Sequence, residues 1–380
     1  MKYRQFGALD FQVSALGFGC MRLPLAGTDS SRIDEPEAIA MIRHAIDHGV
    51  NYVDTAYPYH GGRSEVVLGR ALADGYRERV KVATKMPTFF VEKYEDFDRF
   101  LEEQLDRLGI DHIDFYLLHA LSWKRWPPVR DLGVLDWADR ALETGKIGHI
   151  GFSFHDDLER FEEIVDGYER WSMCLVQHNY MNEDYQAGSR GIRYAAERGL
   201  AVVVMEPLLG GSLAEAPPAV QELWDSAPVR RTPAEWALQW VWNKPEVACV
   251  LSGMSTMEQV TRNLESADRA EPGSLTREEL AVVDRVRERY EELRPIPCTK
   301  CGYCMPCPNG VDIPGNFELY NMVKLFEKPS DVRKMWYQVR LPDETKASAC
   351  IQCGECEEHC PQSIPISEWM PRVHRTMTAD

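Results

Sequence analysis

Eight of the eleven cysteines in this 380-residue chain lie between residues 298 and 360, in two groups of four. An odd total and such crowding argue against a set of disulfides and for bound metal, because thiolates are good ligands for zinc and for iron-sulfur clusters. The first group is Cys298, Cys301, Cys304 and Cys307, and the second is Cys350, Cys353, Cys356 and Cys360.

The spacing of the second group, Cys-x2-Cys-x2-Cys-x3-Cys-Pro, resembles the cluster-binding run of bacterial ferredoxins. The first group is the same run with one residue fewer before its last cysteine. In two-cluster ferredoxins the fourth cysteine of each run ligates the other cluster. The resemblance therefore implies two [4Fe–4S] clusters, one on Cys298, Cys301, Cys304 and Cys360 and the other on Cys350, Cys353, Cys356 and Cys307. The alternative is two structural zinc ions, which more often bind paired Cys-x2-Cys knuckles.

A second set of chemically useful side chains comprises Asp54, Tyr59, Lys85 and His119, which end or follow three consecutive apolar runs. An ammonium beside a phenol favours the phenolate and is expected to lower the phenol's pKa from about 10. An aspartate would hold the ammonium, and a histidine could orient a substrate carbonyl. Tyr59 is then the candidate acid that protonates a carbonyl oxygen, or the base in the reverse direction. Any one of these residues alone would more often be structural.

These side chains must be positioned by the ends of strands. The apolar, β-rich runs are interrupted by amphipathic helical stretches such as 97–108, which ends at Gly109, and by a capping box at 232–235. Eight such units in about 255 residues favour a (β/α)8 barrel, whose active sites gather at the carboxyl ends of the strands. An open doubly wound sheet is the alternative, but Gly17-Phe18-Gly19 lacks its third glycine. The expected strands are 15–19, 51–56, 80–85, 113–119, 147–154, 174–180, 201–207 and 247–253.

A polar helix at 276–294 leads into Arg294-Pro295-Ile296-Pro297, a connector that cannot continue a helix. We therefore predict a barrel domain at 1–294 and a small ferredoxin-like domain at 295–380. Apolar residues at helical spacing between the two cysteine groups favour an α-helical form of this second domain; they are Phe317, Tyr320, Val323 and Phe326.

Several motifs of the first domain resemble the aldo/keto reductases over about residues 1–270. They are Asp54-Thr55-Ala56-Tyr57-Pro58-Tyr59, Gly62-Arg63-Ser64-Glu65, Ala83-Thr84-Lys85, Leu117-Leu118-His119 and Gly145-Lys146-Ile147-Gly148. The resemblance implies a barrel that binds NAD or NADP without a Rossmann turn, and a catalytic tetrad of Asp54, Tyr59, Lys85 and His119.

The same resemblance implies cofactor contacts. Ser153 and Gln177 match the family's carboxamide-binding pair, although Phe154 replaces the usual asparagine. Met205, before Glu206-Pro207-Leu208, replaces the aromatic residue that stacks on nicotinamide. The further expected contacts are Gly19, Cys20 and Met21 beside the nicotinamide, and Pro207, Leu208, Gly210, Ser212, Gly253, Ser255, Gln259, Arg262 and Asn263 along the rest of the cofactor.

The choice between NAD and NADP stays open at this point. The family's lysine and arginine that bind the 2′-phosphate correspond to Gly253 and Gln259, and the loss of two cations weakens the case for NADP. Arg262 is a candidate substitute.

The net charge of −17 disfavours binding to nucleic acid or to an anionic membrane. The sequence predicts no membrane-spanning stretch and no apolar signal-peptide core, so we expect a cytoplasmic protein. Tyr57, Trp123, Trp126 and Tyr180 are candidate residues of the mouth of the barrel, where they would suit a sugar-like or other small carbonyl substrate.

Three interpretations of the combination follow. The first is an oxidoreductase that uses NAD(P), with clusters that link it to a redox partner protein. The second is an electron-transfer or binding protein whose barrel is only a scaffold. The third is a plain reductase whose clusters only stabilise the tail. The complete tetrad favours the first over the second.

Overall fold

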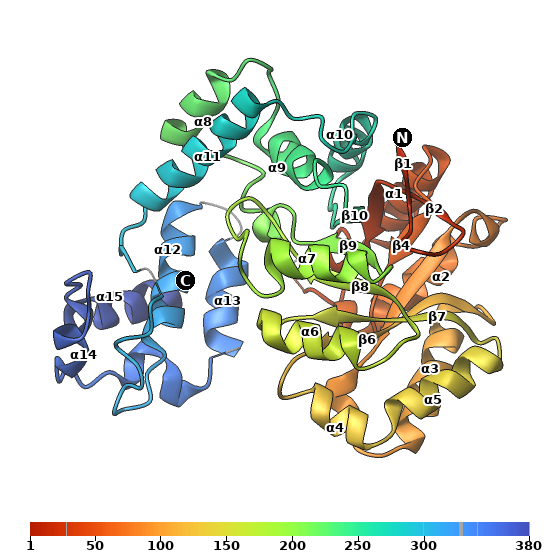
Figure 1. Cartoon of the computed structure of the whole chain (residues 1–380), viewed down its shortest axis with the longest axis horizontal. Helices are drawn as coiled ribbons and strands as arrows, with labels where there is room; N and C mark the ends of the chain where they lie inside the picture. The colour runs from red at the N-terminus through yellow and green to blue at the C-terminus, as the bar shows by residue number, and fades with distance from the viewer. Residues whose placement is uncertain (28, 299, 327–329, 340, 380) are drawn as a thin grey trace. The chain divides into compact units, whose positions relative to one another are not determined.

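The computed structural model describes residues 1–27, 29–298, 300–326, 330–339 and 341–379, with the side chains of 330–332 left out. Within these residues, eight parallel strands close into a barrel in the order β10-β3-β4-β5-β6-β7-β8-β9 (Figure 1). This confirms the barrel and excludes the open doubly wound sheet. The barrel strands are β3 (Leu16–Gly19), β4 (Tyr52–Asp54), β5 (Lys81–Met86), β6 (Ile113–Leu121), β7 (Ile147–Phe154), β8 (Trp171–Gln177), β9 (Ala201–Met205) and β10 (Val247–Ser252).

These strands match the eight expected runs, with β8 beginning and ending three residues earlier than predicted. The strands are buried almost throughout, as expected for a parallel sheet covered on both faces. Helices follow the strands and surround the barrel. They are α1 (Glu35–Asp47), α2 (Arg63–Ala71), α3 (Glu95–Leu108), α4 (Trp126–Asp131), α5 (Val134–Glu143), α6 (Leu158–Asp166), α7 (Gly188–Glu197), α9 (Pro233–Trp242) and α10 (Met257–Ala267).

Local sequence signals explain several of the helix ends. The Asp34 side chain accepts a hydrogen bond from the backbone N–H of Glu37 at the start of α1, and α3 ends at Gly109 in a left-handed conformation. The Thr232 hydroxyl accepts from the N–H of Glu235 at the start of α9, as the capping box predicts.

A short hairpin closes the amino end of the barrel. Its strands are β1 (Tyr3–Gln5) and β2 (Gln12–Ser14), which pair antiparallel. Between them, the Phe6 ring lies 5.8 Å from the ring of Tyr52, the first residue of β4, and 4.8 Å from that of Phe115. Because this end is filled with apolar side chains, the carboxyl ends of the strands are where a substrate site must be sought.

The chain divides into two compact units, which are described separately. The first is residues 1–207 and 237–276, and the second is residues 208–236 and 277–380. The second unit is helical where it is described. Its helices are α8 (Pro218–Asp225), α11 (Arg277–Glu292), α12 (Ile313–Leu325), α13 (Ser330–Val339), α14 (Glu355–Glu358) and α15 (Ile366–Thr378). The predicted polar helix is α11, and the segment between the cysteine groups forms α12 and α13.

A separate apolar core supports the cysteine loops. Ile313, Phe317, Met370 and Val373 from α12 and α15 are buried in it, and six of the eight clustered cysteines pack against it. The Asp312 side chain caps α12 by accepting from the N–H of Gly315. The helices therefore hold the two cysteine groups against one apolar support.

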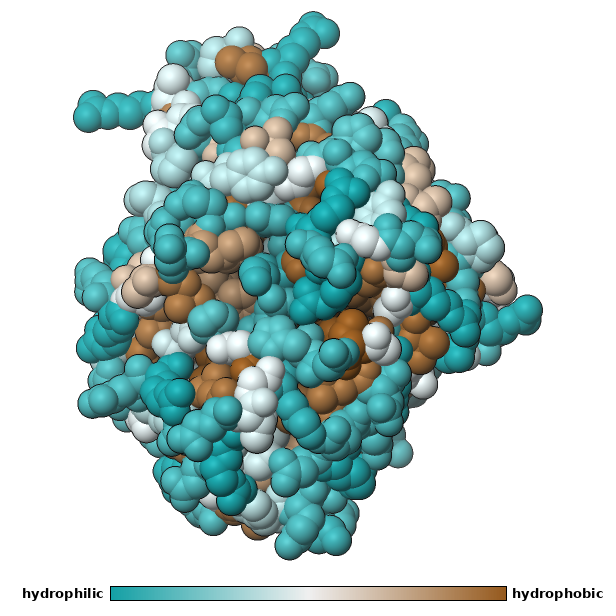
Figure 2. All heavy atoms as spheres, turned by 90° about the vertical axis from the view of Figure 1, so that its right-hand side faces the viewer, coloured by the Kyte–Doolittle hydropathy of each residue, from teal (hydrophilic) through white to brown (hydrophobic). Residues whose placement is uncertain are grey.

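Among the described residues, no helix combines the length and the apolar character needed to span a membrane. On the face of the molecule shown in Figure 2, hydrophilic residues cover most of the surface, and hydrophobic atoms are seen mainly in the hollows between them.

Candidate active site and metal centres

Lys85 is the centre of the predicted tetrad. It lies near the end of β5, its side chain is 1% exposed, and its Nζ lies 2.6 Å from Oδ1 of Asp54 at the end of β4. The same Nζ donates to the backbone carbonyl of Thr55 at 2.7 Å and to the hydroxyl of Tyr59 at 3.4 Å. A buried ammonium is tolerated only where such partners surround it. The structure therefore brings Asp54, Lys85 and Tyr59 together as expected.

The pKa of Tyr59 differs from the sequence-based expectation. Burial raises it above its ordinary value, and the nearby Lys85 ammonium, which lowers it, only partly offsets that effect. Burial likewise works to lower the pKa of Lys85, but Asp54 and Tyr59 hold it above its ordinary value. The expected fall in the pKa of Tyr59 is thus wrong for this structure, because the loss of hydration outweighs the neighbouring charge. The phenol is protonated at neutral pH, as an acid must be before it acts.

His119 completes the set. Its ring centroid lies 6.0 Å from that of Tyr59 and 5.6 Å from that of Phe89. Burial, followed by the charge of Lys85, lowers the pKa of His119 well below its usual value. The imidazole is therefore neutral at pH 7. Its Nδ1 is buried without a hydrogen-bond partner among the described residues. The next residue, Ala120, has a φ of 54°, and its N–H donates to Oγ of Ser153 at 2.7 Å.

The shifted pKa of His119 predicts a pH dependence of stability. Below pH 6.5 the unfolded chain binds a proton at this residue and the folded protein does not, so the free energy of unfolding falls as the pH falls. Between pH 7.5 and pH 5.5 this effect should lower the free energy of unfolding of the wild-type protein by about 1.4 kcal/mol. The variant His119→Asn lacks the titrating ring and should lose that much less over the same interval. Urea unfolding of both proteins at the two pH values measures this, and an unchanged difference would contradict it.

The structure also shows supporting groups that were given no role from the sequence. The Ser64 hydroxyl contacts the Thr55 hydroxyl at 2.9 Å and donates to the Cys20 carbonyl at 3.0 Å. Glu65, which is fully buried, accepts from Thr84 at 2.6 Å and from Gln104, whose Nε2 also donates to the Lys85 carbonyl at 3.1 Å. One signal was available: Gln104 is a polar residue on the otherwise apolar stripe of the 97–108 helix.

The expected nicotinamide-binding residues lie at the carboxyl ends of neighbouring strands. Ser153 is near the end of β7, and Gln177 ends β8 opposite Met205, which ends β9. Gly19 ends β3 and is followed by a short 3-10 helix, Cys20–Arg22, in which Cys20 is buried and Met21 is 52% exposed. Hydroxyl, amide and thioether groups are thus set around one end of the barrel.

The expected phosphate and adenosine contacts fall in both compact units. Pro207 is the last residue of its segment of the first unit, whereas Leu208, Gly210 and Ser212 belong to the second. Gly210 has a φ of 66°, and the buried Ser212 hydroxyl donates to the Leu209 carbonyl at 2.6 Å.

Most of the contacts expected after β10 already interact with protein groups. The Ser255 N–H donates to Oε1 of Gln259 at 2.8 Å, and Asn263 donates to the Ser252 hydroxyl at 3.0 Å. Arg262 is exposed and forms an ion pair with Glu258 at 2.6 Å. Gly253 follows β10 directly, and a Cβ there would lie 3.3 Å from the Arg22 side chain.

The four aromatic candidates for the mouth have different environments. Trp123 is 59% exposed, whereas Trp126 and Tyr180 are buried and pack inside the fold. The Tyr57 hydroxyl donates to Glu103 at 2.8 Å. Trp126 and Tyr180 are therefore packing residues. The exposed Phe89 and Phe90 were not predicted from the sequence, and their rings lie 5.6 Å from that of His119 and 6.4 Å from that of Tyr57, respectively.

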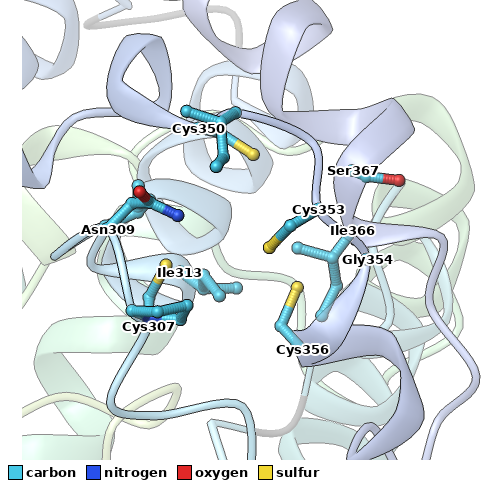
Figure 3. Close-up of a pocket in the computed structure, with 12 residues that line it drawn as sticks. Cys307, Asn309, Ile313, Cys350, Cys353, Gly354, Cys356, Ile366 and Ser367 are labelled. Atoms are coloured by element: carbon cyan, nitrogen blue, oxygen red, sulfur yellow. The ribbon is translucent and has the colours of Figure 1, made fainter.

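The eight clustered cysteines line two pockets. One is lined by Cys307, Cys350, Cys353 and Cys356, whose sulfur atoms point toward a shared space (Figure 3). The other is lined by Cys298, Cys301, Cys304 and Cys360. In each pocket, three close cysteines meet one cysteine from the distant run, which is the grouping expected from the ferredoxin resemblance. Among the described residues, no His, Cys, Asp or Glu group is arranged to hold a single metal ion. Four thiols around one space can supply the ligands of a [4Fe–4S] cluster or of a structural zinc ion.

Comparison with known families agrees with the barrel and its cysteine-rich tail. The model of the aldo/keto reductase family matches residues 15–288, and the chain belongs to that family. The model of the 4Fe-4S dicluster domain matches residues 297–364. The protein is thus a member of a family of oxidoreductases, and this chain carries an iron-sulfur domain in addition.

Individual relatives and solved structures are similar to part of the chain. The chain is 32% identical over 157 residues to the probable aldo-keto reductase 1 of Glycine max, a match that covers 39% of this chain and 44% of that relative. An aldo-keto reductase of Bacillus halodurans in its holo form is 28% identical with a TM-score of 0.62, over 75% of this chain and 96% of its own. An aldo-keto reductase of Klebsiella pneumoniae, solved with NADPH, shares the fold at 24% identity and a TM-score of 0.61, over 76% of this chain and 96% of its own.

Proposed function

We propose that the protein is an NAD(P)-linked oxidoreductase that interconverts a small or sugar-like carbonyl compound and its alcohol, with Tyr59 as the acid and base. The observation that carries the proposal is the buried Lys85, whose ammonium contacts both Asp54 and the Tyr59 hydroxyl. A scaffold without catalytic function has no use for this arrangement. Removing two charges from water costs about as much free energy as their attraction returns, so a buried ion pair adds little to stability.

Each residue of the tetrad has a defined task. In the reductive direction Tyr59 donates its proton to the carbonyl oxygen as that oxygen gains negative charge, and Lys85 stabilises the resulting phenolate. Asp54 keeps Lys85 in place, and the neutral His119 orients the carbonyl. NAD(P)H, when bound, supplies the hydride. One carbonyl compound, one NAD(P)H and one proton then give one alcohol and one NAD(P)⁺.

We propose that the cofactor is held by Ser153 and Gln177 at its carboxamide, with Met205 packed against the nicotinamide. The hydroxyl of Ser153 accepts from Ala120 and can still donate its own hydrogen. NAD and NADP both remain candidates. The Arg262 guanidinium, the candidate substitute for the missing 2′-phosphate contacts, already pairs with Glu258.

For the domain at 295–380 we propose two [4Fe–4S] clusters with the ligand sets that line the two pockets. A hydride is equivalent to two electrons and one proton, and each cluster takes one electron at a time. The two clusters together could therefore accept the two electrons of one hydride, with its proton released to solvent. Exchange with a redox partner protein in the cytoplasm would then return the clusters to their starting state. The alternative, that the clusters only stabilise the tail, rests on the apolar core against which the cysteines pack.

An anaerobic absorbance spectrum of the whole protein, recorded before and after adding NADH or NADPH, distinguishes these alternatives. If the clusters exchange electrons with the nicotinamide, the cluster absorbance at about 400 nm should decrease within the turnover time. If a carbonyl compound is reduced by NAD(P)H while the cluster absorbance does not change, the clusters have a structural role only. If no carbonyl compound in a panel of aldehydes, ketones and aldoses is reduced, the proposed activity is wrong.

A further inference from the structure

His60, the residue directly after Tyr59, has an unusual conformation. It lies in the short helical turn Tyr59–Gly62 with a φ of 53°, and the following Gly61 and Gly62 also have positive φ values, 61° and 87°. Glycine adopts this left-handed region freely, whereas histidine does so only where its surroundings hold it there. The side-chain contacts of His60 therefore need to supply the compensation.

Two hydrogen bonds hold the His60 ring. The backbone N–H of Leu23 donates to Nε2 at 3.2 Å, and Nδ1 lies 2.7 Å from the Ser30 carbonyl. An amide N–H can only donate and a carbonyl can only accept, so Nε2 must carry the lone pair and Nδ1 the proton. The ring thus joins the Tyr59 turn to two points of a separate loop. A Cβ at Gly61 would also lie only 3.4 Å from Cβ of Ser31 on that loop.

This loop also borders the proposed nicotinamide site. Leu23 follows Cys20–Arg22 directly, and the Cys20 carbonyl accepts from Ser64, which in turn contacts Thr55. The residues around Tyr59 are therefore connected to the same loop on both sides, by His60 at Leu23 and by Ser64 at Cys20. By contrast, the Tyr59 hydroxyl contacts Lys85 at 3.4 Å, the longest of the three Lys85 hydrogen bonds. Its position must be set largely by the turn that carries it.

From these contacts we infer that His60 is a positioning residue for Tyr59. Its imidazole, which accepts from Leu23 at Nε2 and donates to Ser30 from Nδ1, ties the turn that carries the proton donor to the loop beside the proposed cofactor site. It thereby sets the distance from the Tyr59 hydroxyl to Lys85 and to the substrate. The inference rests on the proposed function, since it assigns His60 to the same proton transfer.

Replacing His60 with glycine separates positioning from backbone strain. Glycine accepts the left-handed conformation more readily than histidine, so H60G should keep or raise the unfolding temperature. It removes both ring hydrogen bonds, and kcat should fall by about 10-fold to 100-fold, because a misplacement of about 1 Å has such effects. The apparent pKa of the kcat profile assigned to Tyr59 should also shift, since the phenol would sit differently beside Lys85. A purely structural role would not move this pKa.

Asp74→Gly is the matched control. Asp74 also has a positive φ, 58°, and lies in an exposed turn after α2, where its carboxylate forms an ion pair with Arg43 at 2.8 Å. Asp74→Gly should leave both kcat and the pH profile unchanged. If H60G does not fold, His60→Asn replaces it, because asparagine tolerates the left-handed region but is too short to bridge Leu23 and Ser30. Wild-type kcat and an unshifted pH profile in the folded variant would overturn the inference.

A measurement without turnover separates this inference from the proposed function. In whole protein labelled with ¹⁵N-histidine, the variant identifies the His60 signals by their absence. At pH 7.5 the wild-type ring should show a proton on Nδ1 and none on Nε2. The opposite tautomer would overturn the inference even if the enzyme is active. The protein could instead show the expected tautomer but reduce no carbonyl compound. That result would reject the proposed function and the positioning role, but the hydrogen-bonded link between the turn and the loop would still stand.

Discussion

Replacing Tyr59 with phenylalanine should lower kcat for carbonyl reduction by at least about 100-fold, the usual contribution of a positioned general acid. The substitution removes only the hydroxyl that would give its proton to the substrate. The ring can keep its place 5.0 Å from the Lys85 ammonium and 6.0 Å from the His119 ring. The affinity for NADH or NADPH, measured by the quenching of the cofactor's fluorescence on binding, should therefore change by less than about threefold. Steady-state oxidation of the better of the two cofactors at saturating substrate measures kcat.

Tyr76→Phe is the matched control for this experiment. The Tyr76 hydroxyl donates to Asp47 at 3.1 Å, on the outside of the barrel. Its removal should leave kcat unchanged. If kcat of Tyr59→Phe falls by less than about threefold while the control is unchanged, Tyr59 is not the proton donor. Another group must then protonate the carbonyl oxygen.

Replacing Cys307 with serine should remove the same cluster as replacing Cys356, although these residues lie in different runs of the sequence. Both line the pocket shown in Figure 3. Each single variant, and the double variant Cys307→Ser with Cys356→Ser, should retain about four irons out of about eight per chain. Cys307→Ser combined with Cys304→Ser should lose nearly all iron, because Cys304 lines the other pocket. Iron and sulfide analysis of protein purified without oxygen measures each value.

Cys174→Ala provides the control for these variants. Cys174 is buried within β8, and its replacement should leave about eight irons per chain. If Cys307→Ser and Cys304→Ser together retain as much iron as Cys304→Ser alone, then each run holds its own cluster and the crossed assignment is wrong. Stoichiometric zinc in place of iron would reject the clusters altogether.

The position of the tetrad could be predicted because it depends on a regular relation between sequence and fold. Parallel strands of a barrel end at one rim, so Asp54, Lys85 and His119 at three strand ends must lie near one another. The grouping of Cys360 with the first cysteine run likewise follows from spacing that resembles a known cluster-binding domain. Its ligand role, like that of the tetrad, remains a prediction for the experiments above.

The pKa of Tyr59 could not be predicted in the same way. Its direction depends on the balance between the loss of hydration and the charge of Lys85, and the degree of burial is set by side chains from several strands. The exposure of the mouth residues has the same origin. Trp123 and Trp126 are three residues apart, yet one is 59% exposed and the other 2% exposed, because Trp126 is turned into the fold at the start of α4.

Residue types and spacing by themselves determined the barrel, the cysteine-rich helical tail and the identity of the reactive side chains, because periodicity and ligand spacing are written along the chain. Only the tertiary structure decided which backbone groups support them. The Thr55 carbonyl that receives Lys85 and the Leu23 amide that holds His60 have no side-chain signature, and every residue offers the same two groups. Which of them meet a given side chain depends on where the loops run once the barrel has closed.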